Sequence, residues 1–545
     1  MEACLLLLSF LPQIDLLEVS DLVRPLSQER TALFGSHVLL PRKQESLATS
    51  FQDSFLGEPA GFPPVSRGAL EEILRRISGS GGVFFEFIDG TLVVRGSPAV
   101  QERIRAAVGE ISLALSPILL EVSIVEPPPG FEPTGTILTP EETRAVASWR
   151  TITRGTLPVY PGSTVSLSHR EERSIVRDYD VEVAERSMIA DPVVARVLSG
   201  FGLDVRAYLL SDRRVHLTVL ADRAALLEVR EVATEATRIG AIEIPRIGTH
   251  AVASTISVPD GATAVIGSEG GNGGTGFLVC LRPLLPAARP PHSIRALSVG
   301  LLADAGGRLP PSVGDRLEGS DEDEETPFPA TIPASRFLEW LRESIGGPEY
   351  EEAFGRDGLA VAASPGLVVT AGAPGEAVEG ALAFLRALES GPSRAAGLVV
   401  EVLDSTGQPA SRALLSLTQG RSAAAAIGLE TTTIADYSPE IASKASISDP
   451  VVEPEFAGLL VLATALSIEP GRLFLDLDLR VRTAGPERRI PPTAENVGVL
   501  TEIPVTRTAF RRRVTLRPGE PLDLGPVPAS DGSTGSARVR WVAPR

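Results

Sequence analysis

Lysine is almost absent from this 545-residue chain. Lys43 and Lys444 are the only lysines among 51 basic residues, a bias that we interpret as genome composition. The 69 acidic residues outnumber them and give a net charge of −18 at pH 7. Proteins that bind nucleic acid carry a basic stripe, and anionic lipid attracts basic clusters. The acidic balance therefore argues against a nucleic-acid partner, and no polylysine segment is present for a lipid surface.

Cysteine and histidine are also scarce. Cys4 and Cys280 are the only cysteines, and neither belongs to a CxxC pair, which excludes zinc-ribbon and thioredoxin-like sites. We predict that Cys280, in the apolar run Phe277–Leu281, is a small buried residue. None of the five histidines lies three to five residues from another, so the spacing of metal ligands is missing. His216 is predicted to be a packed strand residue.

Long apolar runs are missing as well. No run reaches the roughly 18 apolar residues that a membrane-spanning helix needs, although association with a membrane stays open. The segment Ala3–Leu11 (ACLLLLSFL) resembles the apolar core of a secretory signal. Glu2 stands where such a signal has a positive charge, and Pro12-Gln13 is a poor cleavage site. Residues 1–12 are therefore either a truncated signal segment or a buried apolar strand.

Motifs that mark enzymes are not found. The chain has no G-x-S-x-G elbow for a nucleophile. Gly271–Gly276 (GNGGTG) matches a dinucleotide-binding pattern, but a strand follows it where the pyrophosphate needs a helix N-terminus. We interpret it as a hairpin turn, and acidic pairs such as Glu171-Glu172 as a solvated face. The sequence predicts no catalytic, cofactor-binding or metal-binding residue, and hence a protein that is not an enzyme and has no cofactor.

An internal repeat is the most informative feature of the sequence. Residues 161–221 align without a gap on residues 419–479, at an offset of 258. The repeated positions include Asp191, Pro192 and Gly200 in the first copy, and Asp449, Pro450 and Gly458 in the second. An Asp before Pro is predicted to cap a turn at the entry of a strand. Because a repeat of this length indicates a repeated structural unit, we interpret the chain as a tandem duplication.

The repeat extends on both sides of this block. Ser254–Gly267 matches Arg513–Gly525, and the Pro followed by Gly in each predicts a hairpin. Upstream, the apolar strands ILLEVSIV and LVVEVL place Glu121 over Glu401. The first copy has an extra segment, Thr139–Thr151, with an N-cap signal for a helix that the second copy lacks.

A smaller module precedes the block in each copy. Its predicted elements are a strand, a helix, a strand and a helix, at Ile14–Leu22, Leu70–Ile77, Leu92–Gly96 and Ala99–Ile111 in the first copy, and at Ile294–Leu302, Phe337–Ile345, Leu367–Thr370 and Glu376–Leu388 in the second. The acidic run Asp321–Glu325 is predicted to be a solvated loop. These patterns predict an α+β, β-dominant fold with modules at 13–115, 116–290, 291–395 and 396–545.

This order of elements resembles the secretin family, whose members form rings in secretion systems. Asp89–Gly96 and the helix after it are similar to a ring-building domain of that family. Ile118–Val125, with Glu121 at mid-strand, resembles the first strand of the secretin core. Phe277–Pro283 resembles its final strand, with Arg282 where the family has Thr. Each half is thus identified as a ring-building-like module followed by a secretin-like β module.

Two features depart from the family. A secretin usually has one core domain, whereas this chain has two. The membrane-crossing part of a secretin needs alternating hairpins of about 9–11 residues per strand, but the stretch from Glu126 to Leu157 contains PPPGFEPTG and a predicted helix. The outer-membrane pore of the family is therefore not expected to carry over.

The resemblance implies a structural or assembly role in protein secretion. The expected location is the periplasm or outer membrane of a Gram-negative-type envelope, and the expected partners are further copies of the chain or other secretion-system components. The sheet edges are the expected association surface. The alternative is a soluble periplasmic binding or interaction protein that holds a ligand in a cleft between the halves.

Overall fold

In the computed structural model, part of the chain is described residue by residue. The described residues are 13–18, 38–39, 65, 67–78, 83–88, 91–128, 130–132, 134–184, 187–233, 240–270, 276–285, 294–298, 359–364, 367–371, 375–390, 394–442, 445–491, 499–529 and 531–542. The predicted signal segment 1–12, the acidic run 321–325, the helix at 337–345 and most of the turn at 271–276 lie outside them.

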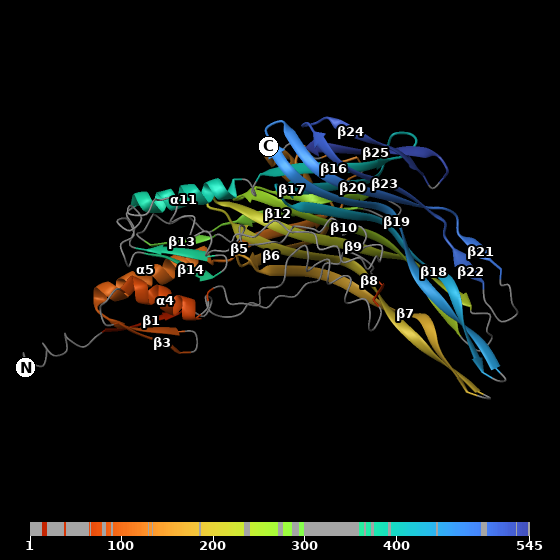
Figure 1. The fold of residues 1–545 in the computed structure, drawn as a ribbon, viewed down its shortest axis with the longest axis horizontal. Coiled ribbons are helices and arrows are strands. Elements are labelled where there is room, and N and C mark those ends of the chain that lie inside the picture. The colour runs from red at the N-terminus through yellow and green to blue at the C-terminus, as the bar shows by residue number, and fades with distance from the viewer. Residues whose placement is uncertain are drawn as a thin grey trace, which may run out of the picture.

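Two large antiparallel sheets, which we call the long sheet and the short sheet, dominate the fold (Figure 1). The long sheet contains β2 (Val38–Leu39), β7 (Thr164–Ala184), β8 (Ser187–Leu209), β9 (Arg214–Ala233), β10 (Ala241–Pro259), β18 (Ser422–Ala442), β19 (Ala445–Glu469), β20 (Arg472–Ala484) and β23 (Val505–Leu516). The short sheet contains, in spatial order, β24 (Pro521–Pro528), β25 (Thr534–Val542), β16 (Ala395–Leu403), β17 (Pro409–Thr418), β11 (Ala264–Gly270), β12 (Phe277–Leu284), β5 (Ile118–Val125) and β6 (Thr151–Val159).

Two small three-stranded sheets lie at the end of the molecule that Figure 1 draws with the helices. They consist of β1 (Gln13–Glu18), β4 (Thr91–Gly96) and β3 (Phe84–Ile88), and of β13 (Ile294–Ser298), β15 (Leu367–Ala371) and β14 (Leu359–Ser364). The helices there are α4 (Arg67–Ser78), α5 (Pro98–Ala114) and α11 (Gly375–Glu389). These elements confirm the predicted strands and helices of the leading modules within the described residues. A two-stranded ribbon, β21 (Arg488–Ile490) with β22 (Leu500–Glu502), completes the strands.

The main hydrophobic core lies between the long and the short sheet. Strand β9 contributes Val215, Leu217 and Val219 to it, and β20 contributes the equivalent alternate residues Leu473, Leu475 and Leu477. Side chains on a strand alternate between its two faces, so this period-two pattern places one apolar face of each sheet against the other. Strand β20 is half-buried, since exposed and buried residues alternate from Arg472 to Leu477, whereas β9 is buried on both faces from Val215 to Ala221.

The ladders β7–β8 and β18–β19 have the same register irregularity in the two halves. The β7–β8 ladder shifts register between Val176 and Asp178, and the β18–β19 ladder shifts between Ile434 and Asp436. The offset between these irregularities is again 258, the value found in the sequence. The strands also occur in the same order in the two halves. In chain order, β5 to β12 of the first half correspond to β16 to β20, and then to β23 to β25, of the second half.

The expected hairpins at Ser254–Gly267 and Arg513–Gly525 are wrong. β10 pairs with β9 and β18 in the long sheet, whereas β11 belongs to the short sheet. β23 and β24 are divided between the sheets in the same way. The Pro-Gly turn is therefore a corner that takes the chain from one sheet to the other, a role for which a tight turn is equally suited.

The predicted turn role of the Asp-Pro pairs is also wrong. Asp191 and Pro192 lie inside β8, where Pro192 faces Tyr179 of β7. Asp449 and Pro450 lie inside β19, and Pro450 faces Tyr437 of β18. The strands are longer than the sequence suggested, so a pair expected at a strand entry lies within the ladder.

The helix predicted within Thr139–Thr151 is confirmed as α6 (Pro140–Val146). Thr139 caps it, because its hydroxyl accepts a hydrogen bond from the Glu142 amide while Glu142 accepts one from the Thr139 amide. In the second half, a short turn held by the Asp404 carboxylate joins β16 to β17 in place of this helix.

Candidate functional site

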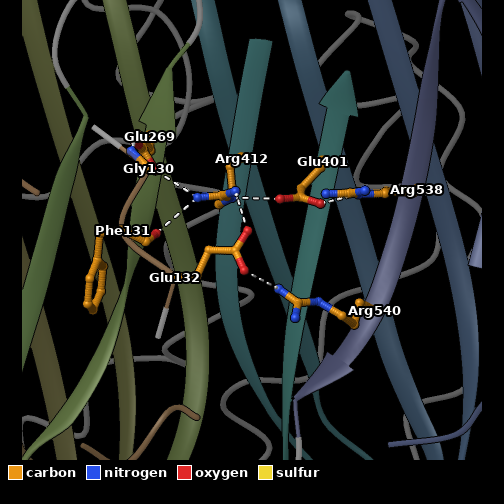
Figure 2. Close-up of polar contacts among 8 residues, drawn as sticks. All are labelled: Gly130, Phe131, Glu132, Glu269, Glu401, Arg412, Arg538 and Arg540. Atoms are coloured by element: carbon orange, nitrogen blue, oxygen red, sulfur yellow. Dashed lines mark hydrogen bonds and ion pairs between the residues drawn. The ribbon is translucent and has the colours of Figure 1, made fainter. Parts of the chain in front are cut away.

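Where the two halves meet, both large sheets continue without a break. In the long sheet, β10 pairs with β18 from Arg246 opposite Thr431 to Ala253 opposite Ala424. In the short sheet, β11 pairs with β17 from Gly267 to Gly270. We call these two ladders together the internal seam. The outer face of the short sheet at this seam holds a cluster of charged residues, which is the candidate site (Figure 2).

Strand alternation places the cluster on the outer face. On β17, Ala413 and Leu415 point into the main core, so Arg412 points to the opposite face. On β16 the same alternation turns Glu401 outward, beside Val400 in the core. Arg538 and Arg540 follow the same rule on β25, because Ala537 and Val539 belong to the core.

Arg412 is the centre of the cluster. Its Nε donates to Glu401 Oε1 at 2.7 Å, its Nη1 to Glu269 Oε2 at 3.1 Å, and its Nη2 to Glu132 Oε1 at 3.2 Å. The same Nη1 also donates to the Phe131 carbonyl at 3.0 Å. Glu401 belongs to the second half, whereas the other three partners belong to the first. One guanidinium therefore joins the halves, as Figure 2 shows.

Two further arginines complete the cluster. Arg538 donates to Glu401 Oε2, and Arg540 Nη2 lies 3.7 Å from Glu132 Oε2. Three guanidinium groups thus face the carboxylates of Glu132, Glu269 and Glu401. Charge-assisted bonds of this kind are stronger than neutral ones, and the balance of charge offsets the cost of burial.

Glu401 is the most buried acid of the cluster, with 1% of its surface exposed. Burial alone would raise its pKa, but hydrogen bonds from Arg538 and Arg412 outweigh burial and hold the pKa of Glu401 below its usual range. The carboxylate is therefore ionised at neutral pH and supplies the counter-charge for both arginines.

A segment of the first half covers the cluster. It begins after β5 and contains Gly130, whose amide donates to Glu269 at 3.2 Å. Phe131 packs edge-on against Trp149, with ring centroids 4.5 Å apart, and Thr134 bonds to Glu142 of α6. These contacts hold the Phe131-Glu132 stretch over the second half. We call residues 126–139 the cover segment.

The predicted repeat positions do not form one site. Gly200 and Gly458 lie within β8 and β19 of the long sheet, while Glu121 and Glu401 lie in the short sheet. Glu401 is in the charged cluster, but Glu121 is 45% exposed and pairs with Arg282 at 3.2 Å. The sequence interpretation missed Arg412 and Glu132. The sequence signal that could have found the cluster is a charged residue in an apolar strand. Glu401 lies in LVVEVL and Arg412 in RALLSL, and a buried charge needs a partner.

The side chains of His216 and Cys280, which are capable of chemistry, are both packed among buried residues. His216 is fully buried, with its Nδ1 3.2 Å from Ser257 Oγ, which confirms the predicted packed strand residue. Burial first, and then Arg421 and Arg214, lower its pKa well below the usual value. Cys280 is buried as predicted, and burial raises the pKa of its thiol to about 12.

Within the described residues, no group of three His, Cys, Asp or Glu side chains is placed to hold a metal ion. Over the same residues, no helix is long and apolar enough to cross a membrane.

A cavity of about 290 Å³ on the long sheet is lined by both halves, including Arg230, Arg246, Glu455 and Glu487. Arg230 Nη1 bonds to Glu487 Oε2 at 2.7 Å there. This cavity is the place that a ligand would take if the chain were a binding protein.

Comparison with known proteins gives structural matches alone. No protein-family model and no curated protein matches the chain. The Salmonella SPI-1 type III secretion injectisome secretin InvG is 11% identical, with 52% of this chain and 90% of that chain covered and a TM-score of 0.22. The type II secretin GspD from enteropathogenic Escherichia coli is 8% identical, over 41% and 85%, with a TM-score of 0.21. For Aeromonas hydrophila ExeD the values are 10%, 88% and 88%, with a TM-score of 0.20. The chain is thus similar in structure, at low identity, to secretins of type II and type III secretion systems.

Proposed function

We propose that this chain is a non-enzymatic, secretin-like structural component of a secretion apparatus in a Gram-negative-type cell envelope. We further propose that its halves descend from one duplicated unit, and that copies of the chain join head to tail through the long sheet. One observation carries the assembly proposal: the strands at the two outer edges of the long sheet are equivalent to the two strands that pair at the internal seam.

The equivalence follows from the offset of 258. β10 of the first half corresponds to β23 of the second, and β18 of the second half corresponds to β7 of the first. β10 and β18 pair within the chain, whereas β23 and β7 lie at opposite edges of the sheet. In the described residues, no strand pairs with β23 away from β20, or with residues 164–172 of β7 away from β8. A strand edge of this kind is a template for another strand.

Exposure distinguishes the open edges from the internal seam. Residues 422–430 of β18 are all buried, whereas the equivalent stretch of β7 exposes Ser168, His169, Glu171 and Glu172. Leu167 and Phe510 pack against the main core but are only partly buried. Their equivalents at the internal seam are the directly opposed residues Ala425 and Val252. Pairing of β23 with β7 of a second copy, in the register of the internal seam, would oppose Phe510 and Leu167 and bury both.

The short sheet is less suited to the same use. Its edge strand β24 contains Pro521, Pro526 and Pro528. Proline donates no backbone hydrogen bond and is common on edges that must not pair. The seam between copies is therefore assigned to β23 and β7. Because the two edges differ, the contact is head to tail and leads to a ring or a filament.

A disulfide tests the register. The internal pair Ala251–Ala426 corresponds to Ala509 of one copy and Ser168 of the next. In a background without Cys4 and Cys280, Ala509→Cys with Ser168→Cys should form cross-linked oligomers on oxidation. Ala251→Cys with Ala426→Cys is the internal positive control. Ala509→Cys with Leu167→Cys, one residue out of register and on the other face, is the negative control.

Light scattering gives the mass of the unmodified chain in parallel. A multimer whose cross-links form only in the expected register supports the proposal. A monomer at all concentrations without cross-links, or equal cross-linking of the out-of-register pair, would contradict it. A monomer that binds a small molecule at Arg230 and Arg246 would favour the alternative of a periplasmic binding protein.

A further inference from the structure

The outer face of the short sheet is less covered around Glu121 in the first half than around the equivalent Glu401 in the second, although α6 lies over part of it. In the second half, the cover segment contacts Arg412 and Arg540, beside Glu401. Glu401 and Arg538, which face each other across β16 and β25, are 1% and 34% exposed there. On the first half, Glu121 and Arg282 form the matching pair across β5 and β12, and they are 45% and 47% exposed.

A groove lies on this open face. Its volume is about 290 Å³, and it runs between α6 and strands β5, β6 and β12. Its lining combines an apolar wall of Val125, Val146 and Cys280 with a polar rim of Ser123, Arg154 and Arg282. Among the described residues, Arg154 donates to Ser123 Oγ at 3.1 Å and meets no carboxylate. With Glu121 paired to Arg282, the rim keeps one positive charge.

We propose that this groove binds an acidic, irregular peptide segment of a partner protein, in the way that the second half binds the Phe131-Glu132 stretch of the cover segment. The chain itself supplies the template: a glutamate meets the arginines, a backbone carbonyl accepts from a guanidinium, and an aromatic ring packs beside α6. Opposite charge at a partly apolar groove is the usual basis for such recognition.

Within the described residues, a second copy of the chain does not supply such a segment through its equivalent strands. The part of the second half equivalent to the cover segment is the turn at 404–408, which Asp404 closes through bonds to Thr406 and Gln408. Such a turn is too short to cross from one half to another. The proposed partner is a different protein, and the site stands whether the chain is a monomer or an assembly.

The probe is a fluorescent peptide with the sequence of residues 128–135 (PPGFEPTG), titrated against the full chain by anisotropy. Saturable binding is expected, with at least a tenfold loss of affinity in Arg154→Glu and in Arg282→Glu. Arg105→Glu, on the exposed face of α5, is the matched control and should leave binding unchanged. A peptide with Gln in place of Glu132 should bind at least fivefold more weakly.

Hydrogen exchange locates the peptide. Protection should increase in β6 at residues 153–156, and the thermal midpoint of each variant should match that of the unmodified chain. Absence of saturable binding, or affinity unchanged by both groove variants, would overturn the proposal. So would binding that Arg540→Glu abolishes and Arg154→Glu does not, because the peptide would then be replacing the cover segment on the second half.

Discussion

At the scale of single residues, burial determines how much the carboxylates at two equivalent positions, Glu401 and Glu121, contribute to the stability of the fold. Glu401→Gln should destabilise the chain by about 3–5 kcal/mol, because it leaves Arg412 buried with one carboxylate fewer and removes the partner of Arg538. Glu121→Gln removes only an exposed pair and should cost about 1 kcal/mol or less. Chemical denaturation of the two variants checks this difference. Equal effects would mean that the cluster is not buried in solution.

A second buried acid makes stability depend on pH. Glu389, at the end of α11, accepts hydrogen bonds from the amide and the hydroxyl of Ser211, in the turn between β8 and β9. Burial raises its pKa to about 7, against the opposing effect of these bonds; Asp212 adds to the rise, and Arg214 opposes it. The folded chain holds this proton more tightly than the unfolded chain does. The contribution of Glu389 to stability therefore falls as the pH rises from about 4.5 through 7.

Glu389→Gln removes this pH dependence. The variant should match the unmodified chain near pH 5 and be more stable near pH 8, by up to roughly 3 kcal/mol. Thermal midpoints at pH 5, 6, 7 and 8 measure the effect. Parallel curves for the two proteins would show that the Glu389 carboxyl is solvated.

At the scale of elements, one glycine in each half sets the close approach of two strands. Gly458 of β19 has φ of 154°, and a Cβ there would lie 2.2 Å from the Ile427 carbonyl oxygen of β18. Gly458→Ala should cost about 2–5 kcal/mol, since backbone must move and the conformation is strained. Gly471→Ala is the control, because that turn glycine has positive φ but open space, and it should cost about 1–2 kcal/mol. Denaturation midpoints compare them.

The type and order of the elements follow from local pattern. The partial alternation of apolar and polar residues in RVHLTVL (214–220) and RLFLDLD (472–478) predicts the strands β9 and β20, and the N-cap signal at Thr139 predicts α6, because these signals depend on neighbouring residues. The charged cluster has no such local signal. Arg412 and Glu132 are 280 residues apart in the chain, and only the pairing of β11 with β17 brings them together. The sequence repeat predicted two equivalent halves but not that they share both sheets.

The internal seam shows why that sharing was hard to predict. Its β18 stretch, Ala423 to Ala426, is made of small residues, and β10 meets it with Ala251 and Ala253. Alanine has low preference for strands, and its pattern gives little information on which strand it pairs with. Which strand β18 pairs with depends on close packing between strands that are distant in sequence. That packing exists only in the folded chain.

At the scale of the whole molecule, head-to-tail assembly predicts complementary defects. Phe510→Lys places a charge at the β23 edge, and Leu167→Lys places one at the β7 edge, in both cases on the side of the main core. A charge that points inward at an edge prevents pairing. Each variant alone should be monomeric, because every contact would contain one modified edge. Mixed in equal amounts, they should form dimers and nothing larger, since one contact per pair keeps Phe510 opposite Leu167. Light scattering of the separate and mixed proteins measures this. Full-size assembly of either variant alone would place the contact elsewhere, whereas a mixture that stays monomeric would mean that the two edges do not meet.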